Sequence, residues 1–197
     1  PVPPPKVSII MPTRDGGSVL ARAVDGVLAG TDYANLELLL IDNGSTCEQT
    51  LGVLARAAED PRVQVLRDDS PFNFSALNNR AAAKARGDVF VLLNDDVEVL
   101  PDQADWLREL ASYALVPEIG CVGAKLLYPD GTVQHGGVIL GIGGVARHAH
   151  KRFPAAHGGY FGRLQLTHAL SAVTAACLAV RRDVWEAMGG LDEGLAV

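Results

Sequence analysis

Three clusters of polar residues each follow a short apolar run, and their side chains are of kinds that bind charged ligands. The clusters are Pro12-Thr13-Arg14-Asp15, Asp42-Asn43-Gly44-Ser45 and Asn94-Asp95-Asp96. Adjacent carboxylates such as those of Asp95 and Asp96 repel each other unless a cation or hydrogen-bond donors compensate their charge. Because Mg²⁺ and Mn²⁺ prefer carboxylate oxygens, the third cluster is a candidate metal site, with a solvated turn as the alternative. The second cluster contains an Asn-Gly pair, so a simple turn is its alternative.

The apolar runs predict the elements that position these clusters. Strands are expected over residues 7–11, 36–41, 63–66 and 89–93, and the first is a continuous apolar run that suits a buried strand. Helical spacing predicts helices between them, over residues 18–30, 51–58 and 75–86, with Ser18 and Ser75 as N-caps. This alternation predicts right-handed crossovers and an α/β fold with a mainly parallel central sheet and helices on both faces. Ligands of such sheets bind beyond the carboxyl ends of the strands, so the three clusters are expected to share one edge.

Asn78, Asn79 and Arg80 lie on the last of these helices, spaced so that some of them could face the same edge. Arg80 could contact a phosphate or a base, and a plain surface arginine is the alternative. The second half of the chain is less regular. It predicts a helix after Asp102, a strand over 119–127, a mobile glycine- and histidine-rich loop over 136–162, a strand over 173–180 and a helix from Asp183 to Met188.

The charges are distributed unevenly along the chain. The net charge of −6 argues against a general nucleic-acid binder. Residues 131–182 contain no Asp or Glu, but they contain six of the 17 Lys and Arg residues and all five histidines. An acidic first part and a cationic later part fit a site that holds a metal and an anionic ligand together. Solvated faces that happen to differ in sign are the alternative.

Cysteines and hydropathy limit the class of protein further. Three cysteines cannot pair completely, and Cys121 and Cys177 lie in apolar runs, so we expect small buried hydrophobes in a reducing compartment. The longest apolar stretch, 169–180, is too short to span a bilayer, so no transmembrane segment is expected. Residues 1–6 are proline-rich and are interpreted as a linker of a longer polypeptide, followed by one domain over 7–197.

Two further patterns in the second half of the chain have simpler explanations than a ligand site. Residues 141–146 match G-x-G-x-x-A, but no acidic residue follows about 20 positions later, so we reject a dinucleotide site. His148 and His150 have no neighbouring cysteine or carboxylate, which makes structural zinc improbable. Contact of these histidines, Arg147 or Lys151 with an anionic ligand is the better functional hypothesis, and a solvated loop is the alternative.

Taken in order, the motifs resemble the family 2 glycosyltransferases of the GT-A fold. They are Val7-Ser8-Ile9-Ile10-Met11-Pro12-Thr13, Ile41-Asp42-Asn43-Gly44-Ser45-Thr46, Leu92-Leu93-Asn94-Asp95-Asp96, Thr174 to Arg182 and Gly189-Gly190-Leu191-Asp192-Glu193. The resemblance implies a nucleotide-diphosphate sugar donor, an Mg²⁺ or Mn²⁺ ion and inversion at the anomeric carbon. It also implies that Asp96 binds the metal and that Asp42 contacts the base. The residues expected to bind the nucleotide-sugar are Pro12, Thr13, Asp15, Asp42, Asn78, Arg80, Asn94 and Asp95.

The sequence departs from the family pattern at two points. Asn94 replaces the usual first aspartate of the D-x-D motif, which weakens its case as a metal ligand. The family takes its general base from an acidic pair beyond the Gly-Gly-x-Asp-Glu segment, so we expect the base beyond Val197 and do not assign it to Asp192 or Glu193. This chain is therefore expected to bind the donor without efficient transfer.

The resulting hypothesis is an inverting glycosyltransferase domain that transfers sugar to a hydroxyl of a glycan or a lipid-linked glycan. The resemblance suggests bacterial envelope or O-antigen synthesis, in the cytoplasm at the inner face of the membrane. A binding or structural module that has lost catalysis is the first alternative. A nucleotidyltransferase is the second, although residues 12–17 match its glycine-rich phosphate loop poorly.

Overall fold

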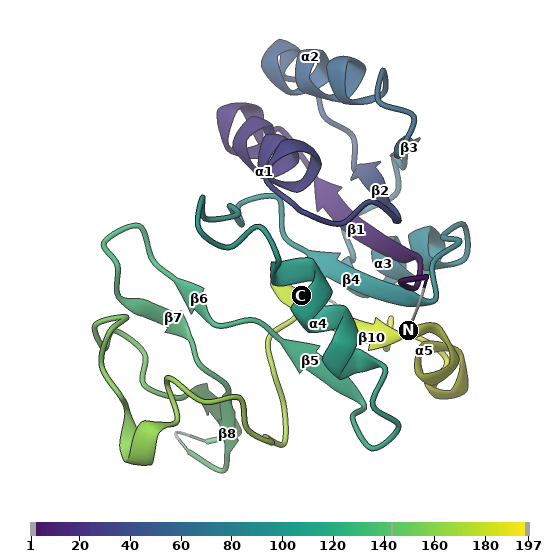
Figure 1. Ribbon diagram of the computed structural model, residues 1–197. Coiled ribbons are helices and arrows are strands. Elements are labelled where there is room, and N and C mark those ends of the chain that lie inside the picture. Colours follow the sequence, from purple (N-terminus) through teal and green to yellow (C-terminus); the bar gives the residue numbers. More distant parts are fainter. Residues whose placement is uncertain (1–2, 143, 196–197) are drawn as a thin grey trace.

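The central element of the fold is a six-stranded sheet with the strand order β3-β2-β1-β4-β10-β5 (Figure 1). The computed structural model describes residues 3–142 and 144–195. The strands are β1 (Val7–Thr13), β2 (Leu36–Asp42), β3 (Val63–Arg67), β4 (Val89–Leu93), β5 (Cys121–Gly123) and β10 (Cys177–Arg181). The first four strands pair in parallel, and β10 is antiparallel to both of its neighbours. The prediction of an α/β fold with a mainly parallel sheet is confirmed.

Helices cover both faces of this sheet. The apolar residues of β1 alternate between the faces, with Ile9 in the core on one side and Ile10 in the core on the other. The first core contains residues of α1 (Gly17–Ala29), α2 (Glu48–Ala57) and α4 (Trp106–Ala114), and the second contains residues of α3 (Phe74–Ala82) and α5 (Arg182–Met188). Burial on both faces explains why β1, β2 and β4 are almost continuously apolar in sequence, whereas the edge strand β3 is only partly buried.

Several helix boundaries differ from those expected. α1 begins at Gly17, so Ser18 lies inside the helix and is not its cap. The cap of α3 is Asn73, whose Oδ1 accepts a hydrogen bond from the backbone N–H of Ala76 at 2.9 Å, and not Ser75. This helix ends at Ala82, and α4 begins at Trp106, four residues after Asp102. Neighbouring polar residues are equivalent as cap candidates in sequence, and only the backbone conformation distinguishes them.

Between β5 and β10 the chain forms a small lobe, at the lower left in Figure 1. Its elements are β6 (Leu126–Leu127), β7 (Val133–His135), β8 (Val138–Leu140), β9 (Ala146–His148) and a short 3₁₀ turn, η1 (Tyr160–Gly162). β6 pairs with β7, and β8 pairs with β9, both antiparallel. The expectations of one strand over 119–127 and of an irregular loop over 136–162 were therefore wrong, because strands of two or three residues are too short to show a periodic pattern.

The expectations for the cysteines, the proline-rich start and membrane spans can also be compared with the structure. Cys177 is buried, and burial raises the pKa of its thiol to about 12, whereas Cys121 is exposed, contrary to prediction. In the proline-rich start, the carbonyls of Pro4 and Pro5 accept hydrogen bonds from Asn35 and Tyr33, while Pro1 and Val2 lie outside the described residues. Gly143 of the glycine pattern and Val197 also lie outside them. Within the part of the chain that the structure describes, no helix has the length and apolar character needed to cross a membrane.

Candidate functional site at the carboxyl edge of the sheet

Thr13 and Asp95 join the ends of two neighbouring strands. Thr13 is the last residue of β1, and Asp95 follows β4 by two positions. The Thr13 hydroxyl donates a hydrogen bond to Oδ2 of Asp95 at 2.6 Å. A Cβ atom on Gly16 would lie 2.9 Å from the same carboxylate oxygen, so only glycine allows the turn before α1 to approach so closely. The carboxylate of Asp95 is thus held against the end of β1.

Asp95 and Asp96 place two adjacent carboxyl groups directly after β4. Burial raises the pKa of Asp95, the Thr13 hydrogen bond opposes this, and the neighbouring charge of Asp96 raises it further. Among the residues described, no Lys, Arg or His forms an ion pair with either carboxylate. Asp96 is exposed and Asp95 is half-buried. A divalent cation would compensate this charge, so the donor set fits Mg²⁺ or Mn²⁺.

The rest of a metal's coordination shell would have to come from water or a ligand. Within residues 3–142 and 144–195, no group of three or more His, Cys, Asp or Glu side chains could hold a metal ion. Asn94 is placed by its backbone, whose N–H donates to the carbonyl of Ala176 at 3.0 Å. Mg²⁺ commonly keeps several waters and binds through one or two carboxylates together with substrate phosphates, which matches a pair of carboxylates at an open edge.

Asp42, at the end of β2, is buried and has fixed partners. Its Oδ1 accepts the backbone N–H of Ser45 at 2.9 Å, and its Oδ2 accepts a charged hydrogen bond from Arg67 at 2.7 Å. Burial works against ionisation of this carboxyl, but the hydrogen bonds from Ser45 and Arg67 outweigh it and hold its pKa below the ordinary value. Asp42 is therefore an ionised acceptor with a fixed orientation at the strand-end edge.

Asp15 connects the turn after β1 to the start of α2. Its Oδ1 accepts backbone N–H groups of Thr46 and Cys47, each at 2.8 Å, and its own N–H donates to the Ser45 hydroxyl at 3.0 Å. The hydrogen bonds from Cys47 and Thr46 lower the pKa of Asp15. Its backbone has φ 53°, a left-handed conformation that non-glycine residues seldom adopt. Asp15 therefore holds two loops of the site together.

Asn78, Asn79 and Arg80 of α3 have three different environments. Asn78 is buried, its amide donates to the Phe74 carbonyl at 2.7 Å, and its Oδ1 has no hydrogen-bond partner among the described residues. Arg80 donates to Asp68 at 2.7 Å and to Ser70 at 2.8 Å, in the loop after β3. The side-chain amide of Asn43 donates to backbone carbonyls of that loop, so Arg80 belongs to the edge of the site.

Asn79, which was not among the expected site residues, binds the C-terminal motif. Its amide donates to the Leu191 carbonyl and to Glu193, both at 2.9 Å, and its Oδ1 accepts the Leu191 N–H at 2.9 Å. A Cβ atom on Gly190 would lie only 2.4 Å from the Asn79 oxygen, so glycine is required there. The segment Gly189-Gly190-Leu191-Asp192-Glu193 is thus fixed to α3.

The structure links four of the predicted residues directly or through one neighbour. Thr13 contacts Asp95, and the Thr13 carbonyl accepts the N–H of Asn43, which adjoins Asp42. Asp15 reaches the same loop through Ser45. Pro12 lies within β1, opposite Ile41, and is half-buried. Arg67 was missed, although it directly follows the strand expected over 63–66 and could have been found by asking which polar residues follow each expected strand.

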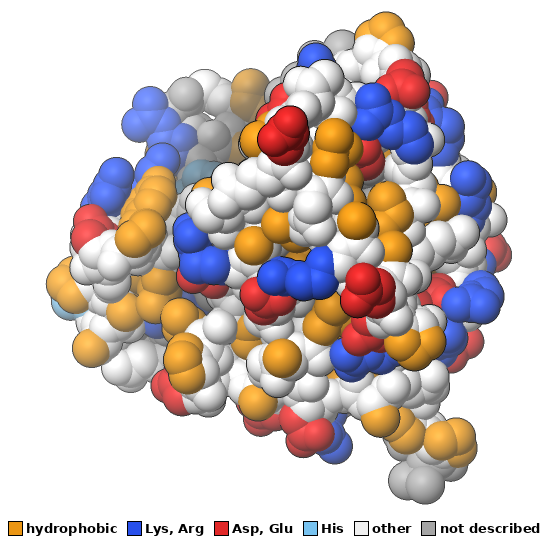
Figure 2. Space-filling model, turned by 90° about the horizontal axis from the view of Figure 1, so that it is seen from above, with side chains coloured by type: hydrophobic (Ala, Val, Ile, Leu, Met, Phe, Trp, Pro, Cys, Tyr) orange, Lys and Arg blue, Asp and Glu red, His pale blue; other side chains and the backbone are white. Residues whose placement is uncertain are grey.

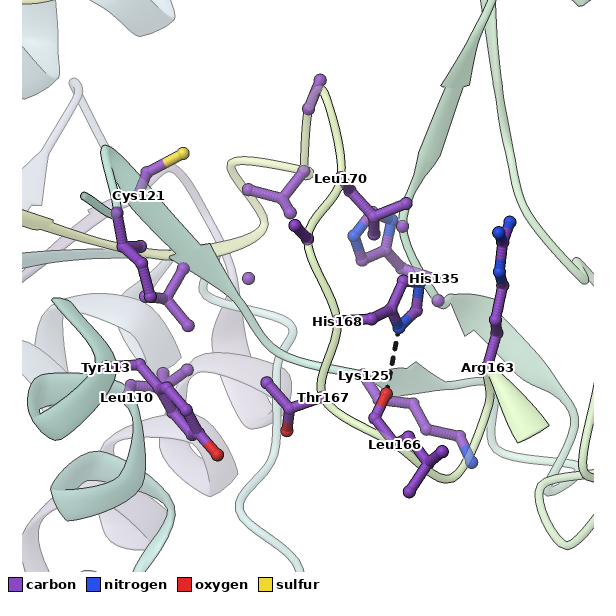
Figure 3. A pocket seen from close by; sticks show the side chains of 18 of the residues that line it. Leu110, Tyr113, Cys121, Lys125, His135, Arg163, Leu166, Thr167, His168 and Leu170 are labelled. Carbon is purple, nitrogen blue, oxygen red and sulfur yellow. Dashed lines mark hydrogen bonds between the residues drawn. The ribbon is translucent and has the colours of Figure 1, made fainter. Parts of the chain in front are cut away.

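Two hollows lie beyond this edge network, towards the small lobe. The larger has a volume of about 730 Å³ and lies between α4, β5 and residues 163–173 (Figure 3). Tyr113, Cys121, His168 and Leu170 are among the side chains that line it. Because β5 is the edge strand farthest from β2 and β3, this cleft is separate from the network around Asp42. The smaller hollow, of about 140 Å³, adjoins the start of β10.

This arrangement, a mostly parallel sheet with acidic strand ends at one edge, defines a GT-A fold with a candidate nucleotide-sugar site. The family model "Glycosyl transferase family 2" matches residues 8–189. The chain belongs to this family. The fold and family predictions are confirmed.

Similar proteins agree with this assignment. The chain is 53% identical over 190 residues to an uncharacterized protein of Sinorhizobium fredii. The match covers 96% of this chain and 21% of that protein. It is 45% identical over 194 residues to an O-antigen biosynthesis protein of Myxococcus xanthus, covering 98% of the chain and 15% of that protein. The chain thus spans about a fifth or less of these relatives.

Two solved structures share the fold. One is a mannosyltransferase from Pyrobaculum calidifontis in complex with GDP-Man and Mn²⁺, with a TM-score of 0.69 at 19% identity, covering 96% of this chain and 48% of that one. The other is S. aureus TarS, with a TM-score of 0.61 at 13% identity, covering 98% and 52%. At these identities the likeness supports the fold alone.

Proposed function

We propose that this chain is the donor-binding domain of an inverting, metal-dependent glycosyltransferase that uses a nucleotide-diphosphate sugar. The observation that carries the proposal is the uncompensated carboxylate pair of Asp95 and Asp96, beside the ordered Thr13 and Asp42 at the same edge. Membership in glycosyl transferase family 2 supports transfer of a sugar. The complex of the similar mannosyltransferase with GDP-Man and Mn²⁺ supports a nucleotide donor and a divalent ion.

Each residue at the edge has a role in this proposal. Asp42, oriented by Ser45 and Arg67, accepts a hydrogen bond from the base of the nucleotide. Asp96 holds Mg²⁺ or Mn²⁺, and Asp95, held by the Thr13 hydroxyl, lies next to it and near the ribose together with Asn94. The metal would neutralise charge that develops on the leaving nucleoside diphosphate. Pro12, Asp15, Asn78 and Arg80 complete the proposed nucleotide-sugar site.

The acceptor in this proposal is a hydroxyl of a glycan or a lipid-linked glycan, and transfer takes place in the cytoplasm at the inner face of the membrane. The name of the Myxococcus xanthus relative supports a role in envelope polysaccharide synthesis. Exposed apolar side chains in the small lobe, including Val145 and Phe161 at 85% exposure each, support contact with a lipid surface. The general base is proposed to lie outside the described residues.

A binding screen with a charge-matched control tests the proposal. UDP-, GDP- and dTDP-sugars are titrated calorimetrically with and without Mn²⁺, and at least one is expected to bind more tightly with the metal. Asp96→Ala should remove this metal-dependent gain. The control is Glu98→Ala. Glu98 lies two residues after Asp96 and forms a surface ion pair with Arg22, so this variant removes the same charge and should retain the metal-dependent gain. If no nucleotide-sugar binds, or if metal-dependent affinity is unchanged in Asp96→Ala, the proposal is wrong.

A further inference from the structure

The smaller hollow, which we call the histidine pocket, has a polar lining. Its polar lining residues are Tyr128, Gln134, His135, His148, Lys151 and Thr174. They come from residues 128–151 of the small lobe and from the segment that leads into β10. Sites for whole small ligands usually measure about 300–1,000 Å³. At about 140 Å³ this pocket suits one chemical group of a ligand and not a whole nucleotide-sugar.

The pocket adjoins the strand-end carboxylates. Thr174 and Ala176 line it, and the Ala176 carbonyl accepts the backbone N–H of Asn94 at 3.0 Å. Cys177 pairs with Leu93 in the ladder between β10 and β4. The segment that lines the pocket is therefore hydrogen-bonded to the turn that contains Asp95 and Asp96.

Two histidines in the pocket share one hydrogen bond, which assigns their protons. Nδ1 of His135 lies 2.8 Å from Nδ1 of His148, and Nε2 of His135 accepts the backbone N–H of Thr174 at 3.4 Å. Burial, and then the proximity of His148, lower the pKa of His135 to about 4, so this imidazole is neutral near pH 7. With Nε2 an acceptor, the His135 proton lies on Nδ1 and is donated to His148. The proton of His148 then lies on Nε2, which makes that atom a hydrogen-bond donor.

The remaining charges favour an anion. No Asp or Glu lines the pocket, and the surrounding sequence 131–182 contains none. Lys151 is exposed, and none of the ion pairs formed within the described residues includes it. A sugar hydroxyl is usually bound by groups that accept its proton, including carboxylates, whereas a phosphate needs donors and positive charge.

We propose that the histidine pocket is an anion subsite that binds a phosphate group through the Lys151 ammonium and the Nε2–H of His148. Tyr128 and Gln134 supply further donors at its wall. His135 is a positioning residue, because it fixes the proton of His148. The phosphate has two possible sources that share this chemistry. One is the diphosphate of the nucleotide donor, in which case the inference rests on the proposed function, and the other is a diphosphate-linked lipid acceptor.

Calorimetric titration with inorganic pyrophosphate, without divalent metal, tests the pocket. Lys151→Gln and His148→Gln should each weaken binding by about tenfold or more, as expected for loss of one charge-assisted hydrogen bond. The control Arg147→Gln removes the same charge from an exposed neighbour on β9 that does not line the pocket, and should change affinity less than about twofold. Equal losses in the Lys151 and Arg147 variants, or no loss in either pocket variant, would overturn the inference.

Two further titrations identify the source of the phosphate. If the pocket variants weaken binding of UDP or GDP, the subsite serves the donor; if they weaken binding of farnesyl diphosphate instead, it serves the acceptor. Pocket-dependent pyrophosphate binding without any nucleotide-sugar binding would refute the proposed function and leave the pocket standing. Nucleotide-sugar binding, together with pyrophosphate and farnesyl diphosphate binding that no pocket variant alters, would refute the pocket and leave the proposed function standing.

The proton assignment has its own spectroscopic test. In ¹⁵N-histidine spectra near pH 7.5, His148 should show a protonated Nε2 and an unprotonated Nδ1. In His135→Phe, which keeps a buried ring but removes the donor, His148 should show a mixture of the two tautomers. An Nδ1-protonated His148 in the unsubstituted protein would refute the assignment.

Discussion

Asp42 is the residue whose side chain is held most firmly at the candidate site. Its carboxylate accepts from Ser45 and Arg67, and each oxygen has a second lone pair for a ligand. Losing a ligand hydrogen bond and leaving its partner unpaired typically costs roughly 1–3 kcal/mol. We therefore expect Asp42→Ala to weaken nucleotide binding by about tenfold or more, measured by calorimetry.

Asp69→Ala is the matched control for this variant. Asp69 also pairs with Arg67, at 2.6 Å, but its side chain is 69% exposed. If binding depends only on how Arg67 is paired, both variants will lose affinity to the same extent. If Asp42 contacts the base directly, only Asp42→Ala will lose affinity for the nucleotide. Unchanged binding of several nucleotides to Asp42→Ala would reduce Asp42 to a turn residue.

Sequence reasoning at this scale could find polar residues at the carboxyl ends of the strands, but not how they pair. Strand ends identified Thr13, Asp42 and Asp95, because apolar runs mark where buried strands stop. The bond between Thr13 and Asp95 joins residues 82 positions apart, and it depends on β1 and β4 being neighbours in the sheet. The sequence did not indicate that His135 pairs with His148, because the strands that carry these histidines, β7 and β9, are too short to show a periodic pattern.

Among the elements, the small lobe combines exposed apolar and basic side chains. Leu140 and Val145 flank the tip of the β8–β9 hairpin, and Phe161 lies in η1, at exposures of 56%, 85% and 85%. Arg147 and Arg163 are exposed in the same lobe. In Figure 2 hydrophobic and basic side chains lie next to one another along the left side of the view. Such surfaces bind anionic lipid headgroups while their apolar side chains enter the interface.

Vesicle co-sedimentation tests the membrane contact. Vesicles that contain phosphatidylglycerol should bind the protein, and phosphatidylcholine vesicles should bind it several-fold less. The double variant Val145→Ser with Phe161→Ser should lose most of this binding. Met188→Ser, a 77% exposed apolar residue at the end of α5, should keep it. Equal binding by all three proteins would exclude the lobe as the contact surface.

The elements also show where sequence patterns are sufficient and where they fail. The strand 89–93 was predicted with the bounds that the structure has, because a continuous apolar run between polar residues has clear ends. The second helix was predicted from the spacing of Leu51, Leu54 and Ala58. Leu54 is buried as expected, but Leu51 is 41% exposed and Ala58 is exposed, and Val53 and Ala57 are buried in their place. A shift of one or two residues in a helix rotates its buried face, which composition alone cannot detect.

At the scale of the whole molecule, donor binding and transfer are separable. The proposed donor-binding residues lie before Val97, whereas transfer also needs a base within hydrogen-bond reach of the acceptor hydroxyl. The two carboxylates of the C-terminal motif already accept hydrogen bonds within the fold. Asp192 accepts from the backbone N–H of Gly194, and Glu193 accepts from the Asn79 amide. General-base assistance is typically worth about 10²–10⁴-fold in rate. We therefore expect this chain to bind donor and to transfer sugar only slowly.

The measurement compares turnover of the 197-residue chain with that of a longer chain that continues past Val197, with the same donor, acceptor and Mn²⁺. The longer chain should be faster by about 10²–10⁴-fold, the size of the general-base contribution. Equal turnover would place the base within these residues, and Asp192 would then be the first residue to substitute.

The position of β10 between β4 and β5 has a consequence for synthesis of the chain. Because β10 pairs with both neighbours, β4 has no partner on that side until residues 177–181 have been made, more than eighty residues after Leu93. At the ~5–20 residues per second of translation, this interval lasts about 4–17 seconds. During it the fully apolar β4 presents an open hydrogen-bonding edge, the feature through which strands of different chains associate. A nascent chain that stalls within the small lobe is therefore exposed to aggregation at β4, and a ribosome-bound chaperone that covers apolar strands would act in this window.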